Sequence, residues 1–491
     1  MLMVDNGYLY GVNEKRLFVN TSLGCTSGCK FCYLSKMGIS DIKRKTWQDI
    51  LEMLNGSDYK YDSNTLITIG CFSECFDELN KKETIEIIKY FLSKGNQVQI
   101  ATKRFVSYED IKDILSLIKY NGQFVIFVSS STITYHDNYE HGTLKLSERF
   151  KTFDLLKYGV PVVLYMKPVL QDITIKDIDL YSKLIEERKI KDVVVGSLFT
   201  ENKSEETVHF SNSNELFYNE CKDEEKIIEV LSSRARVWRR STEILSYKRR
   251  INMIEEVKRK VYELLSRDNS GHGMDHVNRV YKLSVKFAQQ EQADEMVVSL
   301  ISLLHEVDDY KLFGEESARN LTNAKMIMSE VGVDIGTQEK VLDAIRKIGY
   351  KKYLGGVRPD SLEGMIVSDA DMCDGLGVNG ILRTYDYQKA HGRPFFDRNV
   401  FPDSEVTTGN YKLCDDSAVC HCFDKLLRLK GIMMTESGKE EASSRHNIVV
   451  DVLYHLFEEE DAPEWREYLD KFLSELENEN KKDKNVLAKK N

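Results

Sequence analysis

Three cysteines lie within eight residues near the start of the chain, in the stretch LGCTSGCKFCYL. Three residues separate Cys25 from Cys29 and two separate Cys29 from Cys32, with the aromatic Phe31 just before the last cysteine. Cysteine thiolates are soft ligands for zinc and for iron–sulfur clusters, and a four-iron cluster ordinarily takes four of them. Three thiolates would therefore leave one iron open. The alternatives are a zinc site or three cysteines without a common function.

This motif resembles that of the radical S-adenosylmethionine (radical SAM) superfamily, and residues 18–199 look most like the spore photoproduct lyase branch. The resemblance implies that Cys25, Cys29 and Cys32 hold a 4Fe-4S cluster whose open iron chelates S-adenosylmethionine. It further implies that an electron from the cluster cleaves the sulfonium to give a 5′-deoxyadenosyl radical. An electron donor such as flavodoxin or ferredoxin is then expected as a partner.

The same resemblance assigns cofactor contacts to residues that follow successive strands. Gly70 and Glu74 occupy the place where the family's backbone and acidic group meet the SAM amino group, although the usual Gly-Gly-Glu is absent. Thr102 follows the next strand, Ser129 ends the one after, and Arg149 is expected to bind the SAM carboxylate. Each of these could instead be only a polar residue at a strand end.

A second group of chemically active residues lies in SGHGMDHVNRVYKLS, SLLHEVDDYKLFG and IVSDADMCDGLG. His272 and His276 are four residues apart and so share a helix face. These stretches resemble the HD superfamily of metal-dependent phosphohydrolases, most closely a bacterial subgroup that includes nucleotide pyrophosphohydrolases. The family's ligand set falls here on His276, on His305 with Glu306, and on Asp371.

The HD resemblance covers residues 258–465 and implies a divalent ion, since imidazole and carboxylate ligands suit Mn, Fe, Mg or Zn. Such an ion lowers the pKa of bound water and neutralises phosphate charge. We therefore predict catalytic roles for Glu306, Asp309 and Asp371, with Asp309 a candidate base. Glu306 replaces the family's paired aspartate, and Lys347 stands where relatives often place a histidine, so a single metal is expected.

Other polar residues of this half have less specific interpretations. Three further aspartates lie close enough in sequence to compensate or to act as base: Asp308, Asp369 and Asp374. Four cationic side chains match family positions and either bind phosphate or form structural salt bridges: Arg393, His421, Lys425 and Lys439. The triplet Cys420, His421 and Cys422 resembles half a zinc site without a partner pair.

The elements that must position these residues differ between the two halves. Short β-branched stretches, such as residues 66–70, 97–103 and 124–130, alternate with amphipathic helical stretches near residues 82–94 and 108–120. This pattern predicts βα units and a parallel sheet, and the radical SAM resemblance implies a partial (β/α) barrel. From about residue 223 the apolar residues follow a 3.6-residue period, which predicts an all-α second half. The fold class is therefore α/β plus all-α.

The chain is expected to have four parts. They are a radical SAM domain over residues 1–210, a helical connector over 211–250, an HD phosphohydrolase domain over 251–475 and a charged tail over 476–491. The polar stretch 200–217 is expected to be an irregular connection. The tail is poor in apolar residues and is expected to fray.

Composition limits the classes of function. With 42% apolar and 30% charged residues the chain is an ordinary globular one, and its net charge of -10 argues against a protein that coats nucleic acid. A basic run at residues 234–260 is either the solvated face of a helix or a phosphate contact. The start has no signal segment and no stretch approaches the length of a membrane helix, so we expect a cytoplasmic protein without a membrane partner.

These observations together predict a bifunctional enzyme. A radical SAM domain would modify a small molecule, most simply a nucleotide, and an HD domain would remove phosphate or pyrophosphate from it. Two alternatives stay open at this point. The chain is a radical SAM enzyme that modifies or repairs nucleic acid, or its HD half is a nucleotide-binding regulatory module.

Overall fold

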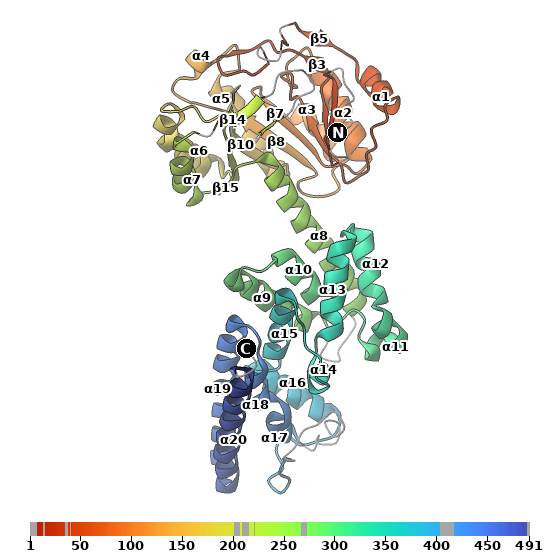
Figure 1. Cartoon of the computed structure of the whole chain (residues 1–491), viewed down its shortest axis with the longest axis vertical. Helices are drawn as coiled ribbons and strands as arrows, with labels where there is room; N and C mark the ends of the chain where they lie inside the picture. Colours follow the sequence, from red (N-terminus) through yellow and green to blue (C-terminus); the bar gives the residue numbers. More distant parts are fainter. Residues whose placement is uncertain are drawn as a thin grey trace. The chain divides into compact units, whose positions relative to one another are not determined.

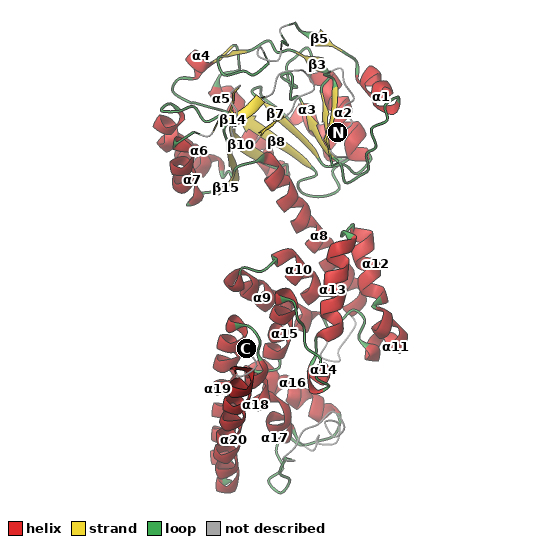
Figure 2. Ribbon diagram, in the orientation of Figure 1, coloured by secondary structure: helices red, strands yellow, loops and turns green. Residues whose placement is uncertain are grey.

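The computed structural model describes residues 7–12, 15–34, 38–39, 41–200, 207–208, 216–219, 221–266, 273–402 and 417–488. The chain divides into two compact units, Met1–Asn252 and Met253–Asn491. The first unit combines a sheet with helices, whereas the elements described in the second are all helices (Figures 1 and 2). The finer division into four functional parts stays a prediction.

An eight-stranded sheet organises the first unit, in the order β1-β2-β6-β7-β8-β10-β11-β15. Its strands are β1 (Leu9–Val12), β2 (Arg16–Val19), β6 (Leu66–Ile69), β7 (Val98–Thr102), β8 (Phe124–Ser129), β10 (Val162–Met166), β11 (Asp192–Val195) and β15 (Arg236–Trp238). Only the pair β1 and β2 is antiparallel, and every other neighbouring pair is parallel. The predicted parallel sheet is therefore present. It is an open sheet with β1 and β15 at its edges, and the described residues show no closed barrel.

From β2 onward, each strand of this sheet lies beside the strand of the sheet that comes next along the chain. The chain therefore crosses the sheet in one direction only. Successive right-handed crossovers of this kind place their helices on one face of the sheet. The crossover helices are α2 (Lys81–Ser93), α3 (Tyr108–Leu115), η1 (Phe150–Tyr158), α6 (Ile178–Arg188) and α7 (Asp223–Ser232). The opposite face is left for the functional residues and for the start of α8 (Ser241–Leu265).

The two faces of the sheet are visible in the alternation along β8, which is buried over its whole length. Phe124, Ile126 and Val128 belong to the large core beneath the helices. Val125 and Phe127 face the other way and pack with Ile244 and Leu245 of α8. Strands buried on both faces read as continuous apolar runs, which is why the sequence predicted them.

Short strands and helices build the loops at the carboxyl edge of the sheet. They are β3 (Ser22–Leu23), β4 (Gly28–Cys29), β5 (Lys43–Arg44), α4 (His136–Tyr139), β9 (Glu140–His141), α5 (Leu146–Arg149) and η2 (Thr174–Asp177). Helix α1 (Trp47–Asn55) belongs instead to the crossover from β2 to β6 and packs in the large core with α2. The stretch 200–217, predicted to be irregular, instead contributes to a three-stranded antiparallel sheet of β12 (Leu198–Thr200), β14 (Leu216–Asn219) and β13 (Thr207–Val208).

Helices α9 to α20 form the second unit around one continuous apolar core. They are α9 (Met274–Glu291), α10 (Glu295–Leu304), α11 (Tyr310–Asn320), α12 (Thr322–Val331), α13 (Ile335–Lys347), α14 (Tyr350–Leu354), α15 (Leu362–Asp374), α16 (Gly377–Ala390), α17 (Ala418–His421), η3 (Cys422–Leu426), α18 (Leu427–Leu429), η4 (Lys430–Ile432), α19 (Glu436–Glu459) and α20 (Pro463–Ala488). The predicted frayed tail is helical as far as Ala488, since α20 continues through it.

None of the described helices is both long and apolar enough to span a membrane.

Candidate active sites

Four side chains of the second unit converge on one point. His276, His305, Glu306 and Asp371 each offer a ligand atom, and these atoms lie within 4.8 Å of one another. The Nε2 atom of His276 is 3.2 Å from Nε2 of His305, 3.5 Å from Oε1 of Glu306 and 3.4 Å from Oδ1 of Asp371. Four tetrahedral ligands about 2.1 Å from one ion are about 3.4 Å apart, so the spacing fits a single divalent metal ion.

Three elements bring this group together. His276 lies in the first turn of α9, His305 and Glu306 directly follow α10, and Asp371 lies near the end of α15. Helix α9 packs against both α10 and α15, which joins residues almost a hundred positions apart. His272, which shares a predicted helix face with His276, lies outside the described residues.

A surrounding set of contacts orients both imidazoles. Nδ1 of His276 is 2.7 Å from Oδ2 of Asp374, and Nδ1 of His305 is 2.8 Å from the Ser302 carbonyl oxygen. Metal-binding histidines usually donate their second N–H in this way, which leaves Nε2 directed toward the metal. The structure therefore makes Asp374, predicted as a compensating ligand or base, a partner of His276.

Two arginines hold Asp374 in turn, and neither was predicted from the sequence. Arg279 donates from Nε to Oδ1, at 2.6 Å, and from Nη2 to Oδ2, at 3.0 Å. Arg383, on α16, donates to Oδ2. Arg279 lies one helical turn after His276 on α9. This i+3 spacing is the one feature of the sequence that could have indicated its role.

The carboxylates around His276 control its charge. Burial alone lowers the pKa of His276, but the contacts with Asp371, Asp374 and Glu306 outweigh burial and raise that pKa well above its usual value. Burial likewise raises the pKa of Asp371, yet His276 outweighs it and the net shift is downward. A bound cation would take over this neutralising role from a protonated imidazole.

Two lysines approach the same group. Burial lowers the pKa of Lys425, and the Asp371 carboxylate opposes that shift. Burial also lowers the pKa of Lys352, with Glu306 opposing it. Both amines are thus close enough to influence an anion held at the four ligands.

Other predicted residues lie elsewhere. Asp309 accepts the Lys311 backbone N–H at 2.9 Å and caps α11, so it is not part of the four-residue group. Lys347 pairs with Asp343 and Asp360 away from this group. The remaining predicted phosphate ligands have other contacts: Lys439 pairs with Glu436, and Arg393 donates to Gln388.

The cysteine motif of the first unit lines a cavity of about 690 Å³. Cys25, Cys29 and Cys32 border it, and all are free of disulfides. The predicted cofactor residues at the ends of β6, β7 and β8 border it as well: Gly70, Glu74, Thr102 and Ser129. Its volume lies in the range of cavities that hold cofactors and drug-sized ligands.

The cysteine loop is held by backbone pairing and by one arginine. Cys29 pairs with Glu140 in the two-stranded sheet of β4 and β9. Arg104 donates to the Thr26 hydroxyl at 3.1 Å, to the Gly142 carbonyl at 3.2 Å and to Asp77 at 3.2 Å. These contacts fix the loop over the carboxyl edge of the sheet.

Glu74 is buried and its carboxylate already has partners in the protein. It accepts the backbone N–H groups of Lys103, at 2.8 Å, and Phe76, at 3.1 Å, and also the Thr102 hydroxyl. Gly70 has a φ of +86°, and a Cβ there would lie 2.6 Å from the Cβ of Cys75, so only glycine fits this strand end.

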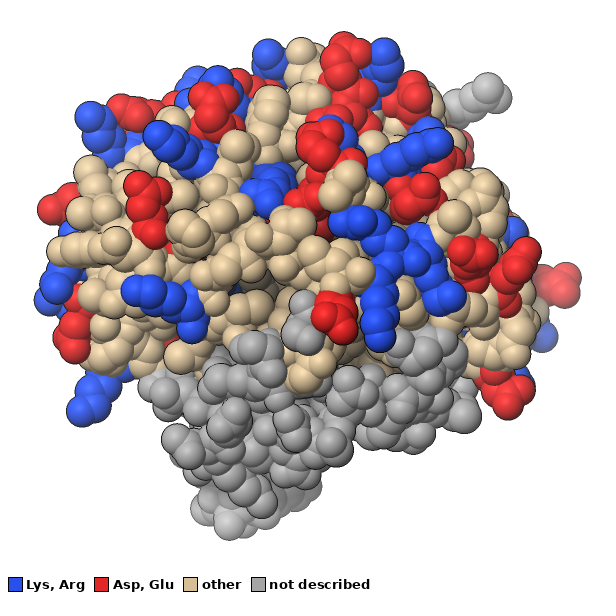
Figure 3. Space-filling view, turned by 90° about the horizontal axis from the view of Figure 1, so that it is seen from above, with Lys and Arg blue, Asp and Glu red and all other residues tan. Residues whose placement is uncertain are grey.

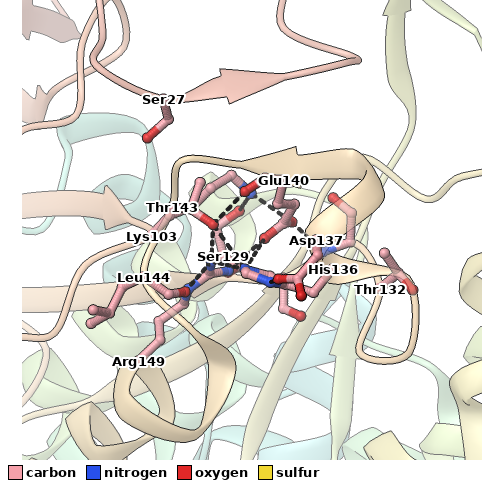
Figure 4. A network of polar contacts seen from close by, with 12 residues as sticks. Ser27, Lys103, Ser129, Thr132, His136, Asp137, Glu140, Thr143, Leu144 and Arg149 are labelled. Atoms are coloured by element: carbon pink, nitrogen blue, oxygen red, sulfur yellow. Dashed lines mark hydrogen bonds and ion pairs between the residues drawn. The ribbon is translucent and has the colours of Figure 1, made fainter.

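Arg149 does not border the cavity, because its guanidinium is completely buried in a polar network (Figure 4). It pairs with Oε2 of Glu140 at 2.7 Å and donates to the Ser129 carbonyl at 2.6 Å. Glu140 also accepts from Nζ of Lys103 at 2.9 Å, and this lysine reaches the Ser129 hydroxyl. Lys103, which does border the cavity, is therefore the cationic end of this network.

Burial raises the pKa of the Cys29 thiol to about 11, and Lys103 only partly opposes this. Within the described residues the three sulfurs do not converge as tightly as the four ligands of the second unit do.

The basic run at residues 234–260 is largely neutralised. Acidic partners occur along it: Glu186 for Arg234, Asp192 for Arg236 and Lys248, Glu224 and Glu225 for Arg239, Glu255 for Lys258, Glu256 and Glu263 for Arg259, and Glu330 for Lys260. On the face seen in Figure 3, basic and acidic side chains are intermixed. Most of the run is therefore ion-paired, whereas its Arg240 borders the cavity of the first unit.

Comparison with known proteins finds a relative of similar sequence and solved structures similar to parts of the chain. No family model matches the chain. Over 221 residues, 43% of this chain and 95% of the relative, the chain is 29% identical to the uncharacterized protein YpgQ of Bacillus subtilis (strain 168). The crystal structure of YpgQ in complex with ADP covers 43% of this chain and 96% of that one, at 25% identity and a TM-score of 0.34.

Two further solved structures are similar to parts of the chain. Spore photoproduct lyase complexed with dinucleoside spore photoproduct is 12% identical and covers 48% of this chain and 78% of that one, with a TM-score of 0.35. An HD-superfamily hydrolase of Bacillus thuringiensis is 29% identical and covers 43% of this chain and 99% of that one, with a TM-score of 0.36. The chain is thus similar to HD-superfamily hydrolases over 43% of its length.

Proposed function

We propose that the chain is a bifunctional enzyme whose second unit is a metal-dependent phosphohydrolase acting on a nucleotide. The convergence of His276, His305, Glu306 and Asp371 supports this activity most directly. The 29% identity to an HD-superfamily hydrolase of Bacillus thuringiensis supports it as well, and the ADP complex of YpgQ makes ADP a rational first ligand to test.

In the proposed reaction the four residues bind a divalent ion and the protein holds the substrate beside it. The ion would supply Lewis acidity, an activated water molecule and neutralisation of phosphate charge. Asp374 and the Ser302 carbonyl accept from Nδ1 of the two imidazoles, which turns Nε2 of each ring toward the other ligands. Lys425 and Lys352 are placed to attract a phosphate group.

The test is phosphate or pyrophosphate release from ADP and from nucleoside triphosphates by the full chain, with Mn, Fe, Mg and Zn compared. His276→Ala should abolish the metal-dependent release. The matched control is His391→Ala, because His391 is an exposed histidine just after α16 whose imidazole contacts Tyr387. Tight nucleotide binding without turnover under all four metals would instead favour a regulatory module.

We propose that the first unit generates a 5′-deoxyadenosyl radical. The proposal is supported by the three thiols of Cys25, Cys29 and Cys32 on one cavity that also meets the ends of three parallel strands. A 4Fe-4S cluster with S-adenosylmethionine would supply the electron and the radical. Lys103, which lies over the Phe31 ring, and Arg104, which donates to the Thr26 hydroxyl, position the cysteine loop.

Anaerobic reconstitution tests this half. The parent chain should bind about four irons and, once reduced, release 5′-deoxyadenosine. Cys29→Ala should lose both properties, whereas Cys221→Ala should keep them, because Cys221 lies outside this cavity and donates to Gln171. Retained SAM cleavage in Cys29→Ala would remove the cluster from the proposal.

A further inference from the structure

The cavity of the first unit has two ends because of the strand order. The cysteines and the predicted cofactor residues border it at the ends of β6, β7 and β8. The next strands in the sheet, β10, β11 and β15, bring a second polar group to the same cavity. We call this group, formed by Lys167, Ser197, Arg240, Ser241 and Thr242, the distal group. None of its members belongs to the predicted cofactor site.

The members of the distal group are neighbours because their strands are neighbours. Lys167 directly follows β10, and Ser197 follows β11 by one residue. A Cβ placed on Gly196 would lie 3.1 Å from Cδ of Lys167 and 3.3 Å from the Arg239 carbonyl. The Lys167 stem therefore passes over Gly196 beside the chain that leads into α8.

Charge along the cavity points to an anionic ligand. Its basic lining residues are Arg16, Lys103, Lys167 and Arg240, whereas Glu74 is its single acidic lining residue within the described part of the chain. Glu74 accepts from Thr102 and from the Lys103 backbone, and the Lys103 ammonium pairs with Glu140 near the cysteines. Two carboxylates lie close to the distal group, and both have partners. Glu243 accepts the backbone N–H groups of Arg239 and Arg240, and Glu224 accepts the Ser197 hydroxyl at 3.4 Å and pairs with Arg239.

The first residues of α8 strengthen this preference. Ser241 and Thr242 open a helix of 25 residues and border the cavity, so the positive end of the helix dipole is directed at this part of the wall. Loops after the last strands of a β/α fold, combined with a helix N-terminus, recur as phosphate sites. Basic side chains from two strand ends are here a second, independent feature of the same place.

Aromatic side chains complete the cavity between its two ends. Phe18, Phe31, Phe127 and Tyr165 border it, and rings of this kind stack on nucleobases. A nucleotide offers both a base for these rings and a phosphate for the distal group. Its sugar would then lie between the rings and the distal group.

We propose that the distal group binds the phosphate of the nucleotide that the radical acts upon. This inference rests on the proposed radical function and adds the substrate class and the end of the cavity that recognises it. Binding of the phosphate at this end orients the nucleoside toward the cofactor end. The shared chemistry is an anionic phosphate group, which is a monoester in the nucleotide, the free anion in inorganic phosphate and a diester in an oligonucleotide.

The experiment is calorimetric titration of the reconstituted full chain with the four ribonucleoside 5′-monophosphates, their nucleosides, inorganic phosphate and a short single-stranded oligonucleotide. Every protein in the titrations carries Asp371→Ala, so that the second unit contributes equally to the measured binding in parent and variants. At least one monophosphate should bind about tenfold or more tightly than its nucleoside, because hydrogen bonds to charged groups are strong. Inorganic phosphate should compete with that monophosphate, though more weakly than the nucleotide binds.

Arg240→Gln and Lys167→Gln should each weaken the binding of the monophosphate about tenfold, and Arg240→Lys should retain most of the affinity. The matched control is Arg234→Gln, which removes the same charge from a nearby arginine that pairs with Glu186 and does not border the cavity. Equal binding by Arg240→Gln, Lys167→Gln and parent overturns the inference. So does equal affinity for nucleotide and nucleoside, or binding of the oligonucleotide alone.

SAM cleavage without nucleotide is measured on the same samples and separates two kinds of failure. Intact cleavage with unchanged affinity in both variants means that only the phosphate site is wrong. Absence of cleavage in the parent chain means that the proposed radical function fails. If a variant does not fold, phosphate competition on the parent protein still decides the outcome.

Discussion

Nδ1 of His276 lies 2.7 Å from Oδ2 of Asp374, and Asp374 is also held by Arg279 and Arg383. This contact fixes which imidazole nitrogen faces the other three ligands. Replacing Asp374 by asparagine keeps the shape but removes the charge. We expect Asp374→Asn to bind Mn or Zn about 10 to 100 times more weakly, since loss of such outer contacts commonly has that effect.

Chelator competition measures this affinity. The matched control is Asp309→Asn, because asparagine also caps helices and Asp309 caps α11 rather than joining the ligands. Its metal affinity should equal that of the parent. Equal affinity in Asp374→Asn as well would show that the contact does not orient His276.

Glu306 provides a second prediction, through the length of its side chain. Its Oε1 atom is 3.5 Å from Nε2 of His276 and 3.6 Å from Nε2 of His305. Aspartate would withdraw the oxygen by about 1.5 Å, whereas metal–ligand distances tolerate only about 0.2 Å. Glu306→Asp should therefore bind metal more weakly than the parent, and Glu306→Ala more weakly still.

Metal content after dialysis, together with phosphate release, checks this order. Glu316→Ala on the surface of α11 serves as a charge-matched control. Parent-like metal content in Glu306→Ala would exclude Glu306 from the ligands.

The buried Glu140 gives a prediction about stability and pH. Burial alone would raise its pKa, but Lys103 and Arg149 outweigh burial and lower it from 4.5 to about 2. A carboxylate whose pKa is lower in the folded state stabilises the fold above the unfolded pKa. That contribution, about 3 kcal/mol, should be lost as the pH falls from about 4.5 to about 2.

Glu140→Gln leaves the buried Arg149 and the partly buried Lys103 without this partner and should destabilise the first unit by about 3 to 5 kcal/mol at neutral pH. The difference between parent and variant should shrink between pH 4.5 and 2. Urea unfolding read from β8 peptides by hydrogen exchange isolates this unit. The control is Glu148→Gln, whose half-exposed ion pair with Lys151 should change stability by less than about 1 kcal/mol.

Much of the sheet was predictable because β-branched stretches buried on both faces have few other interpretations. The strands β12, β13 and β14 were missed, since polar residues between 200 and 217 are typical of loops and only pairing reveals the sheet. The helix at the C-terminal end was missed for a related reason. Its lysines and glutamates favour helix by propensity, although they offer few apolar contacts.

For the candidate sites, the sequence indicated side chains but not their partners. His276, His305, Glu306 and Asp371 were chosen through family resemblance, and the structure brings all four together. The role of Arg149 could not be foreseen, because it depends on Glu140 being buried beside it. Arg383 likewise acquires its role only where α16 meets Asp374.

The last prediction is that the two activities can be removed separately. Each set of residues lies within its own compact unit, because the cysteines fall in Met1–Asn252 and the four converging ligands in Met253–Asn491. Asp371→Ala should stop metal-dependent phosphate release and leave uncoupled 5′-deoxyadenosine formation near the parent rate. Cys25→Ala should do the reverse.

Mass spectrometry of reaction mixtures extends this test to the shared nucleotide. If both units act on one nucleotide, the two variants should accumulate different intermediates, one still phosphorylated and modified, the other hydrolysed and unmodified. Each variant mixed with the other should restore the final product, since every unit remains intact in one of the two chains. The same final product at the parent rate from Asp371→Ala alone would show that hydrolysis is not a step toward it, and the second unit would then act on a separate nucleotide.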